Sequence, residues 1–321
     1  LLNAAGYKAL VCGNIGYPVS RAVMENSDYD CIVLEISSFQ IDATEFFRPF
    51  ISVVTNITPN HLDRYSSFEE YKLSKKNIFK NQGASDFAIL NYNDINVKFI
   101  SKDISPHKVY FNYQGVNGFF IDCDNIMRND CGNLNYIINV KDLQIFGMHN
   151  YENAMAGAAA ALLFGANIDK VREGLKNFKG VEHRFEFFEE INDVKYYNDS
   201  KATSVDSVKK SLEAFAGNII LIAGGRDKNS DYTELRELIR LKVKRLILTG
   251  EAAEKMRDQI NLPEITVIEP DFIQAVTLAY RSAVAGDSVL LSPACASYDR
   301  FANFEKRGEF FKETVRKLKN L

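Results

Sequence analysis

The amino-acid sequence contains no Gly-Lys dipeptide, and it therefore lacks the phosphate-binding loop G-x-x-x-x-G-K-[ST]. Runs of about 18 apolar residues are also absent, and the first residues do not show a basic segment followed by an apolar one. The formal net charge of −3 provides no basic surface for nucleic acid or for an anionic membrane. We therefore expect a cytoplasmic protein that binds neither nucleic acid nor membranes.

Cysteines are few, and their number is odd. The five cysteines lie at positions 12, 31, 123, 131 and 295, mostly inside apolar runs, which is typical of reduced, buried thiols rather than of a disulfide framework. Cys123 and Cys131 could approach each other across a hairpin as a zinc or disulfide pair. No second ligand pair accompanies them, so the reduced state is favoured.

The length of 321 residues predicts two domains, because a domain commonly holds about 150 residues. Hydrophobic residues make up 46% of the chain and charged residues 25%, which is typical of a globular protein rather than a disordered one. We place the boundary near Gly180, which gives a first domain of residues 1–180 and a second of residues 181–321.

Continuous apolar runs alternate with helical stretches in the first domain, at residues 8–11, 31–36, 51–57 and 87–90. This alternation predicts a mostly parallel sheet with helices on both faces. Between residues 108 and 146, short strands separated by Asn-Gly, Asp-Asn and Gly-Asn turns predict an antiparallel hairpin region appended to the sheet. An Ala-rich helix is expected over residues 152–164, with Gly165 as its C-cap.

The second domain begins with a predicted hairpin, residues 185–190 and 194–198. Short apolar runs follow, separated by stretches of helical period, at residues 219–223, 245–249, 265–268 and 288–291. This is the pattern of a Rossmann-like, doubly wound α/β domain. Two polar motifs, residues 198–203 (NDSKAT) and 292–297 (SPACAS), stand where predicted strands end, and ligands bind at such strand ends.

Glu35 ends an otherwise apolar strand, and His61 follows the next long strand. In a parallel sheet both side chains would emerge at the carboxyl edge, where a carboxylate and an imidazole could hold a hard divalent cation such as Mg²⁺. The alternative is a surface glutamate and a turn histidine, and histidine is an unusual ligand for magnesium.

Lys75 lies in the middle of an apolar helical stripe. The helix expected after a capping box of Ser67 and Glu70 places four apolar side chains on the same face, those of Phe68, Tyr71, Ile78 and Phe79. A lysine in apolar surroundings has a lowered pKa, and its neutral amine can react with carbon dioxide to give a carbamate, an anionic metal ligand. Alternatively, the Lys75 side chain extends along the stripe and places its ammonium group in solvent.

Asn150 and Asn153 stand one turn apart at the start of the Ala-rich helix. Asn150 could cap this helix, and two exposed amides at this spacing could also hydrogen-bond the edge of a purine. In the second domain, Arg184 and Lys201 offer positive charge for phosphates, and Asp199 can accept hydrogen bonds from ribose hydroxyls. Surface ion pairs would explain the same charges.

Residues 224–228 (GGRDK) directly follow a predicted strand and could form an anion site, although their spacing is not G-x-G-x-x-G. Lys228 at this turn could instead bind a carboxylate. We interpret Cys295 as a packed thiol rather than a nucleophile, because its neighbours are small and no histidine follows position 183.

Together these motifs resemble the Mur ligases, and among them the members that add D-glutamate. The resemblance rests on residues 35–40 (EISSFQ), 60–65 (NHLDRY), 149–153 (HNYEN), 198–203 and 292–297, and it covers nearly the whole chain. It implies a central ATP- and magnesium-binding domain in residues 1–180, truncated at its N-terminus, and a Rossmann-like domain for the incoming amino acid in residues 181–321. The implied activity is ATP-dependent joining of D-glutamate to UDP-N-acetylmuramoyl-L-alanine through an acyl phosphate, in peptidoglycan precursor synthesis. We expect a monomer.

By this resemblance, Glu35 and His61 would serve Mg²⁺, and Lys75 would be a carbamylated lysine and the third metal ligand. Asn14 and Ser37 would lie near phosphates or the muramoyl substrate. The residues expected at ATP are Asn150, Asn153, Arg184 and Asp199, with Lys201 close to the transferred phosphate or the incoming amino acid. The residues expected at D-glutamate are Thr203, Lys228, Ser297 and Phe304.

In the family, a phosphate loop and a uridine-nucleotide domain precede the point at which this sequence begins. We therefore expect the chain as given to be a fragment with little or no activity of its own. Two alternatives stay open, a ligase like folylpolyglutamate synthetase, which adds L-glutamate to a pterin, and a non-catalytic binding module. The motifs at residues 198–203 and 292–297 speak against the folate relative.

Overall fold

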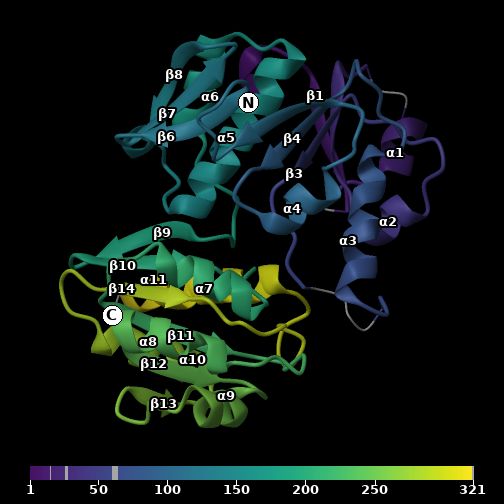
Figure 1. Ribbon diagram of the computed structural model, residues 1–321. Coiled ribbons are helices and arrows are strands. Elements are labelled where there is room, and N and C mark those ends of the chain that lie inside the picture. The colour runs from purple at the N-terminus through teal and green to yellow at the C-terminus, as the bar shows by residue number, and fades with distance from the viewer. Residues whose placement is uncertain (15, 26–27, 60–63, 320–321) are drawn as a thin grey trace. The chain divides into compact units, whose positions relative to one another are not determined.

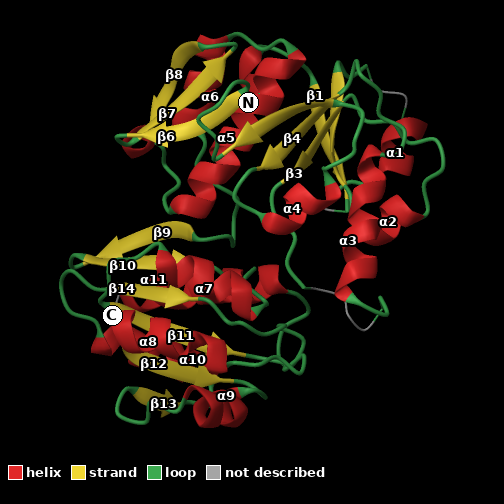
Figure 2. Ribbon diagram, viewed as in Figure 1, coloured by secondary structure: helices red, strands yellow, loops and turns green. Residues whose placement is uncertain are grey.

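The computed structural model spans residues 1–321 and describes all of them except residues 15, 26–27, 60–63 and 320–321. His61, a candidate metal ligand, lies outside the described residues. The chain divides into two compact units, Leu1–Phe178 and Lys179–Leu321. Each unit has its own parallel-dominated sheet covered by helices (Figures 1 and 2).

The first unit holds a two-stranded sheet, β1-β2, and a six-stranded sheet in the order β3-β4-β5-β6-β7-β8. Its strands are β1 (Ala9–Gly13), β2 (Cys31–Glu35), β3 (Ile51–Val54), β4 (Phe87–Asn91), β5 (His107–Phe111), β6 (Gly118–Asp122), β7 (Asn125–Asp130) and β8 (Asn133–Asn139). Its helices are η1 (Asn3–Ala5), α1 (Val19–Met24), α2 (Ser38–Asp42), α3 (Phe68–Lys76), η2 (Asn77–Phe79), α4 (Ile95–Ile100), η3 (Val140–Asp142), α5 (Met148–Phe164) and α6 (Ile168–Asn177).

The antiparallel region is smaller than the sequence predicts. Strand β5 pairs in parallel with both β4 and β6, and only β6, β7 and β8 form antiparallel hairpins. After β5 the chain turns back between Asn112 and Asn117, both with a φ of 59°, and β6 then starts beside Tyr110 in the same direction as β5. The Asn-Gly signal at this point therefore ends a return loop and not a tight hairpin turn.

One helix start and one capping motif also depart from the sequence prediction. Helix α5 starts at Met148, earlier than expected, because Gly147 with a φ of 93° serves as its N-cap; its C-cap, Gly165, is left-handed as predicted. At the start of α3, the hydroxyl of Ser67 accepts from the Glu70 N–H, as a capping box requires. The Glu70 carboxylate, however, accepts from the N–H and hydroxyl of Ser66, so only half of the predicted box forms.

Both faces of the larger sheet are covered. Helix α5 packs across β3, β4, β5 and β6, whereas α4 packs on β4 and contacts α3. Because neighbouring residues of a strand point to opposite faces, Ile89 of β4 joins the core beneath α5, and Leu90 joins the core that contains Tyr71 and Phe79. The alanines of α5 allow this helix to lie close to the sheet.

The second unit has one sheet in the order β13-β12-β11-β14-β10-β9. All neighbours are parallel except the hairpin β9-β10. The strands are β9 (Glu186–Ile191), β10 (Val194–Asn198), β11 (Ile219–Gly224), β12 (Val243–Thr249), β13 (Thr266–Ile268) and β14 (Ser288–Leu291). The helices are α7 (Val205–Glu213), η4 (Thr233–Leu235), α8 (Arg236–Lys242), α9 (Ala253–Ile260), α10 (Phe272–Ser282) and α11 (Phe304–Lys319).

The doubly wound architecture predicted for this unit is confirmed. Helix α7 contacts α8, and α10 contacts α11 on a separate core that includes Ile222, Val289 and Phe311. Burial on both faces explains why β11, β12 and β14 are almost continuously apolar. The chain passes from β10 to β11 and later returns to place β14 between them, so the carboxyl ends of these three strands are neighbours.

None of the described helices is long and apolar enough to cross a membrane.

Candidate functional site

The structure brings Asn14 and Glu35 together at the carboxyl ends of β1 and β2. The side-chain Nδ2 of Asn14 donates to Glu35 Oε1 at 3.2 Å, and its backbone N–H donates to the Glu35 carbonyl at 2.8 Å. Gly13 permits this approach, because it has a φ of 116° and a Cβ atom there would lie 2.2 Å from the same carbonyl. The result is an oxygen-rich pair of side chains at the edge where the sequence predicts a metal site.

Lys75 and Glu35 line one cavity of about 660 Å³ between β2 and β3, which also includes Thr55 and Asn56 directly after β3. Lys75 is half-buried, and burial lowers its pKa, although the negative charges of Glu35 and Asp42 oppose this shift. Hard divalent cations prefer oxygen ligands, so the carboxylate and amides around this cavity fit Mg²⁺. A carbamate on Lys75 would add two further oxygens.

Ser37 caps the N-terminus of helix α2. Its hydroxyl accepts from the Gln40 N–H, and the Gln40 side chain accepts from the Ser37 N–H at 2.9 Å, which makes Ser37 the N-cap of α2. The capping box accounts for a serine and a glutamine at this spacing. Contact between Ser37 and a substrate stays a prediction.

Asn150 and Asn153 lie on the first turns of α5. Asn150 is buried and donates to a backbone carbonyl just before the helix, whereas Asn153 is exposed. Between them in sequence, Glu152 accepts from Asn112 Nδ2 at 2.8 Å, and Asn112 also donates to Asn91 at 3.0 Å. These contacts tie the start of α5 to the ends of β4 and β5. Sequence reasoning missed Asn91 and Asn112, although both are polar residues where an apolar strand ends.

Asp199 is buried in the second unit, and both of its carboxylate oxygens are engaged. Oδ1 accepts from the backbone N–H of Phe185 at 3.1 Å, and Oδ2 accepts from the hydroxyls of Ser211 and Ser292 at 2.6 and 2.7 Å. Burial raises the pKa of Asp199 to about 6, and the hydrogen bonds partly oppose this rise. The carboxylate thus joins the β9 hairpin, α7 and the loop after β14, and its predicted contact with ATP stays a prediction.

Two pairs of candidate residues meet near these strand ends. The Lys201 Nζ lies 5.7 Å from the centre of the Phe304 ring. The Lys228 Nζ donates to the backbone carbonyl and to the hydroxyl of Thr203, at 3.3 Å each. Ser297 is buried in the loop after β14. The second unit therefore gathers the residues expected at D-glutamate on the loops that follow β10, β11 and β14 and at the start of α11.

Cys295 is fully buried between these loops. Its sulfur lies 3.1 Å from the Tyr232 hydroxyl, which donates to Asp227 at 2.8 Å. Burial raises the pKa of the Cys295 thiol to about 11. A protonated, enclosed thiol supports the interpretation of Cys295 as a packing residue.

Arg184, expected at ATP, is exposed beside a cluster of Glu182, His183 and Glu186 whose ligand-type atoms lie within 4.8 Å of one another. Lys312 pairs with both carboxylates, at 2.8 Å to Glu186. The amide Nδ2 of Asn198 lies 2.9 Å from His183 Nδ1 and donates to Glu186. These partners account for the cluster without a metal ion.

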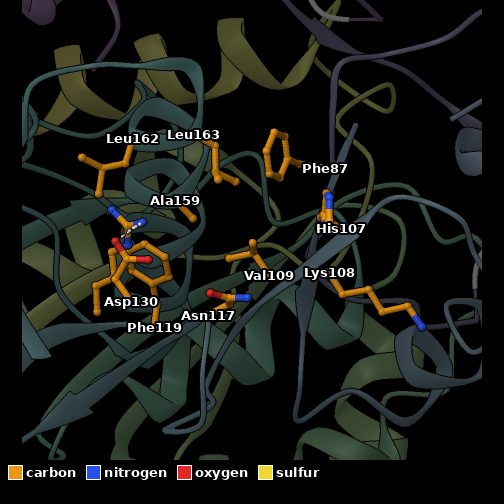
Figure 3. Close-up of a pocket in the computed structure, with 11 residues that line it drawn as sticks. Phe87, His107, Lys108, Val109, Asn117, Phe119, Asp130, Ala159, Leu162 and Leu163 are labelled. Atoms are coloured by element: carbon orange, nitrogen blue, oxygen red, sulfur yellow. Dashed lines mark ion pairs between the residues drawn. The ribbon is translucent and has the colours of Figure 1, made fainter. Parts of the chain in front are cut away.

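A separate cavity of about 290 Å³ lies at the opposite edge of the first unit's sheet, near the starts of β4 and β5. Figure 3 shows Phe87, Val109 and Leu163 among its apolar walls, with Lys108 and Asp130 among its polar side chains. None of the candidate residues that the structure describes lines this cavity, so it is distinct from the sites described above.

Comparison with known proteins covers both units. Residues 9–161 match the model of the Mur ligase middle domain, and residues 183–295 match that of the Mur ligase, glutamate ligase domain. The UDP-N-acetylmuramoylalanine--D-glutamate ligase of Thermoanaerobacter sp. (strain X514) is 46% identical over 98% of this chain and 70% of its own length. The enzyme of the same name from Alkaliphilus metalliredigens is 39% identical over 99% of this chain and 71% of its own length.

Solved structures show the same fold at low sequence identity. MurF from Acinetobacter baumannii superposes with a TM-score of 0.76 at 17% identity, over 100% of this chain and 73% of that one. MurF ligase from Thermotoga maritima in complex with ADP gives a TM-score of 0.74 at 16% identity, over 99% of this chain and 77% of that one.

Asp199→Asn should change how stability depends on pH. The pKa of Asp199 is about 6 in the folded chain and about 3.9 in the unfolded chain, so the folded state binds more protons between these pH values. This carboxyl group therefore makes the free energy of unfolding fall as pH rises from about 4 to about 6, by up to about 3 kcal/mol. Asparagine does not titrate, so the variant should lack this pH-dependent contribution. Denaturant unfolding at several pH values measures the free energy of unfolding of both proteins and checks the difference. Identical pH profiles for the two proteins would contradict the buried, titrating carboxylate.

Proposed function

Because this chain belongs to the Mur ligase family, we propose that its gene product is the ATP-dependent ligase that joins D-glutamate to UDP-N-acetylmuramoyl-L-alanine in peptidoglycan precursor synthesis. The observation that carries this proposal is similarity along both units, at 39–46% identity, to relatives named for that reaction. The chain spans about 70% of the length of those relatives. Its nucleotide substrates place the proposed reaction in the cytoplasm.

The proposed reaction activates a carboxylate. A carboxylate oxygen of UDP-N-acetylmuramoyl-L-alanine attacks the γ-phosphorus of ATP, and the bond to ADP breaks, which leaves an acyl phosphate. The neutral amine of D-glutamate then attacks the acyl carbon and loses a proton. Inorganic phosphate leaves with one of the original carboxylate oxygens, and an amide bond remains. Positioning and electrostatic stabilisation carry most of the catalysis in such transfers.

In the first unit, Glu35, His61 and a carbamylated Lys75 would hold Mg²⁺, which neutralises phosphate charge during the transfer. The contact between Asn14 and Glu35 supports this proposal, because it orients the carboxylate at the cavity that Lys75 also lines. Asn14 would assist at the phosphates and Ser37 at the muramoyl substrate. The residues proposed to bind ATP are Asn150, Asn153, Arg184 and Asp199.

In the second unit, Thr203, Lys228, Ser297 and Phe304 would bind D-glutamate, with Lys201 near the transferred phosphate. The hydrogen bonds between Lys228 and Thr203 support this assignment, because they place an ammonium group beside a hydroxyl, a suitable pair for a carboxylate.

The proposal predicts phosphate release from ATP by the protein expressed from its complete reading frame, in the presence of UDP-N-acetylmuramoyl-L-alanine and D-glutamate. L-glutamate should not replace D-glutamate. A protein that releases no phosphate with either acceptor, but does so with a pterin substrate and L-glutamate, would be a relative of folylpolyglutamate synthetase. Absence of release with all substrates would favour a binding module.

Lys75→Ala should lower kcat by about 100-fold or more, since it removes a group that would hold the cation at the developing phosphate charge. Excess bicarbonate should not restore activity in this variant. With ¹³C-bicarbonate, NMR should show a carbamate signal in the wild type that grows as pH rises, because more of the amine is then neutral. Lys80→Ala, at an exposed lysine on the turn after η2, is the matched control and should keep both activity and signal. Full activity of Lys75→Ala would remove the carbamate from the mechanism.

A further inference from the structure

Arg307 of α11 is a buried cation whose hydrogen bonds all end on neutral oxygens. Its side chain is 2% exposed. Nε and Nη2 donate to the hydroxyl and the carbonyl of Ser200, both at 2.9 Å. Nη2 and Nη1 also donate to the carbonyls of Cys295 and Ala296, at 3.2 and 3.3 Å. None of the ion pairs found in the described part of the chain includes Arg307.

This arrangement is unusual, because buried arginines and lysines are nearly always paired with a carboxylate. Lys312 of the same helix obeys that rule, since it is 7% exposed and pairs with Glu182 and Glu186. Arg307 and Lys312 therefore form a natural comparison: two buried cations on one helix, of which Lys312 is in an ion pair and Arg307 is not.

The charge of Arg307 persists at neutral pH. Burial lowers its pKa to about 10, whereas electrostatic interactions with Cys295 and Asp299 oppose this shift, so the guanidinium stays protonated. Burial also lowers the pKa of Lys228, and the positive charge of Arg307 contributes to that shift. The two groups are thus close enough to repel each other, and a negative group bound beside them would relieve the repulsion.

Arg307 lies beneath the ends of three strands. Ser200 follows β10, and Cys295 and Ala296 follow β14. Gly225 follows β11 with a φ of 136°, and a Cβ atom at this position would lie 3.1 Å from Arg307 Nη1. The carboxyl ends of strands in a doubly wound sheet are where ligands bind, so the Arg307 cation, which has no ion-pair partner among the described residues, lies directly under a binding edge.

We propose that Arg307 is a positioning residue that makes the acceptor site selective for an amino acid with two carboxylates over one with a neutral side chain. The inference rests on the proposed function, in which this acceptor is D-glutamate. Arg307 is too deeply buried to touch the ligand. It acts through the positive potential that it adds to Lys228 and through the carbonyls of Ser200 and Ala296, which it holds in place.

The test compares D-glutamate with D-glutamine, which has nearly the same shape and one negative charge fewer. In wild type, kcat/KM should favour D-glutamate. Arg307→Met should lower the D-glutamate to D-glutamine ratio by about tenfold or more, mainly through a higher KM for D-glutamate, because one charge at moderate distance contributes on this scale. Arg307→Lys keeps the charge and should hold the ratio within about threefold at pH 7.

Lys312→Met is the matched control, since it removes from α11 a buried cation that is held in ion pairs. It should destabilise the protein and leave the ratio unchanged. An unchanged ratio in Arg307→Met would overturn the proposal, and so would an equal loss in Arg307→Lys, which would make Arg307 a hydrogen-bonding scaffold only. An equal loss in Lys312→Met would point to general destabilisation and would also overturn it.

If Arg307→Met does not fold, Arg307→Lys carries the test through its pH profile. A buried lysine loses its proton more readily than arginine, so the ratio should fall more steeply between pH 7 and pH 9.5 in this variant than in wild type. Lys228, Cys295 and Asp299, which act electrostatically on this position or are affected by it, are present in both proteins and contribute equally to the two profiles. Parallel profiles would contradict the role of charge.

A binding measurement tests the role of Arg307 even if the proposed ligase activity is wrong. If the wild-type protein releases no phosphate with D-glutamate, equilibrium dialysis with labelled glutarate still measures selection of a dicarboxylate. Weaker binding of glutarate by Arg307→Met or by Arg307→Lys at pH 9.5, at least about tenfold relative to wild type, would support the inference about Arg307 without the ligase activity. Equal binding would overturn it.

Discussion

The buried hydrogen bonds of Asp199 and Arg307 hold together the loops on which the candidate site of the second unit depends. Asp199 joins the β9 hairpin, α7 and the loop after β14, whereas Arg307 joins the loops after β10 and β14 to α11. Ser200 links the two sets, since it follows Asp199 in sequence and its hydroxyl donates to the Phe304 carbonyl. These buried hydrogen bonds fix the loops and the helix start that carry Thr203, Ser297 and Phe304.

Burying two charged groups costs stability, and a structure selected only for stability would place apolar residues there. Satisfied polar networks instead fix loops in one arrangement, because each donor and acceptor has a defined partner. The first unit follows the same principle on a smaller scale. Gly13 allows Asn14 to approach Glu35, and the resulting hydrogen bonds orient a carboxylate at the cavity that Lys75 lines.

Much of the fold was predictable, because local pattern determines the elements. Continuous apolar runs predicted the parallel strands, and β14 (Ser288–Leu291) coincides with its predicted range. The direction of β5 and β6 was not predictable, since an Asn-Gly pair can end a long return loop as well as form a hairpin turn. The start of α5 at Met148 depends on the φ of Gly147, which the composition of the segment does not specify.

The candidate site was predictable as a set of motifs at strand ends, but the direction of individual side chains was not. Asp199 looks like a surface carboxylate in the sequence, yet Ser211 and Ser292, which engage it, are distant along the chain. Arg307 was missed for the same reason. Its partners include backbone carbonyls, which carry no residue-type signal and come together only when the sheet has formed.

The most direct test of the proposed chemistry follows an oxygen atom. UDP-N-acetylmuramoyl-L-alanine labelled with ¹⁸O in its carboxylate is incubated with ATP, D-glutamate and the protein expressed from the complete reading frame, and the released phosphate is analysed by mass spectrometry. Acyl activation predicts one ¹⁸O atom in each phosphate, and release that requires D-glutamate. Unlabelled phosphate would show that ATP is hydrolysed by water, and it would contradict the assignment of this protein as an amide ligase.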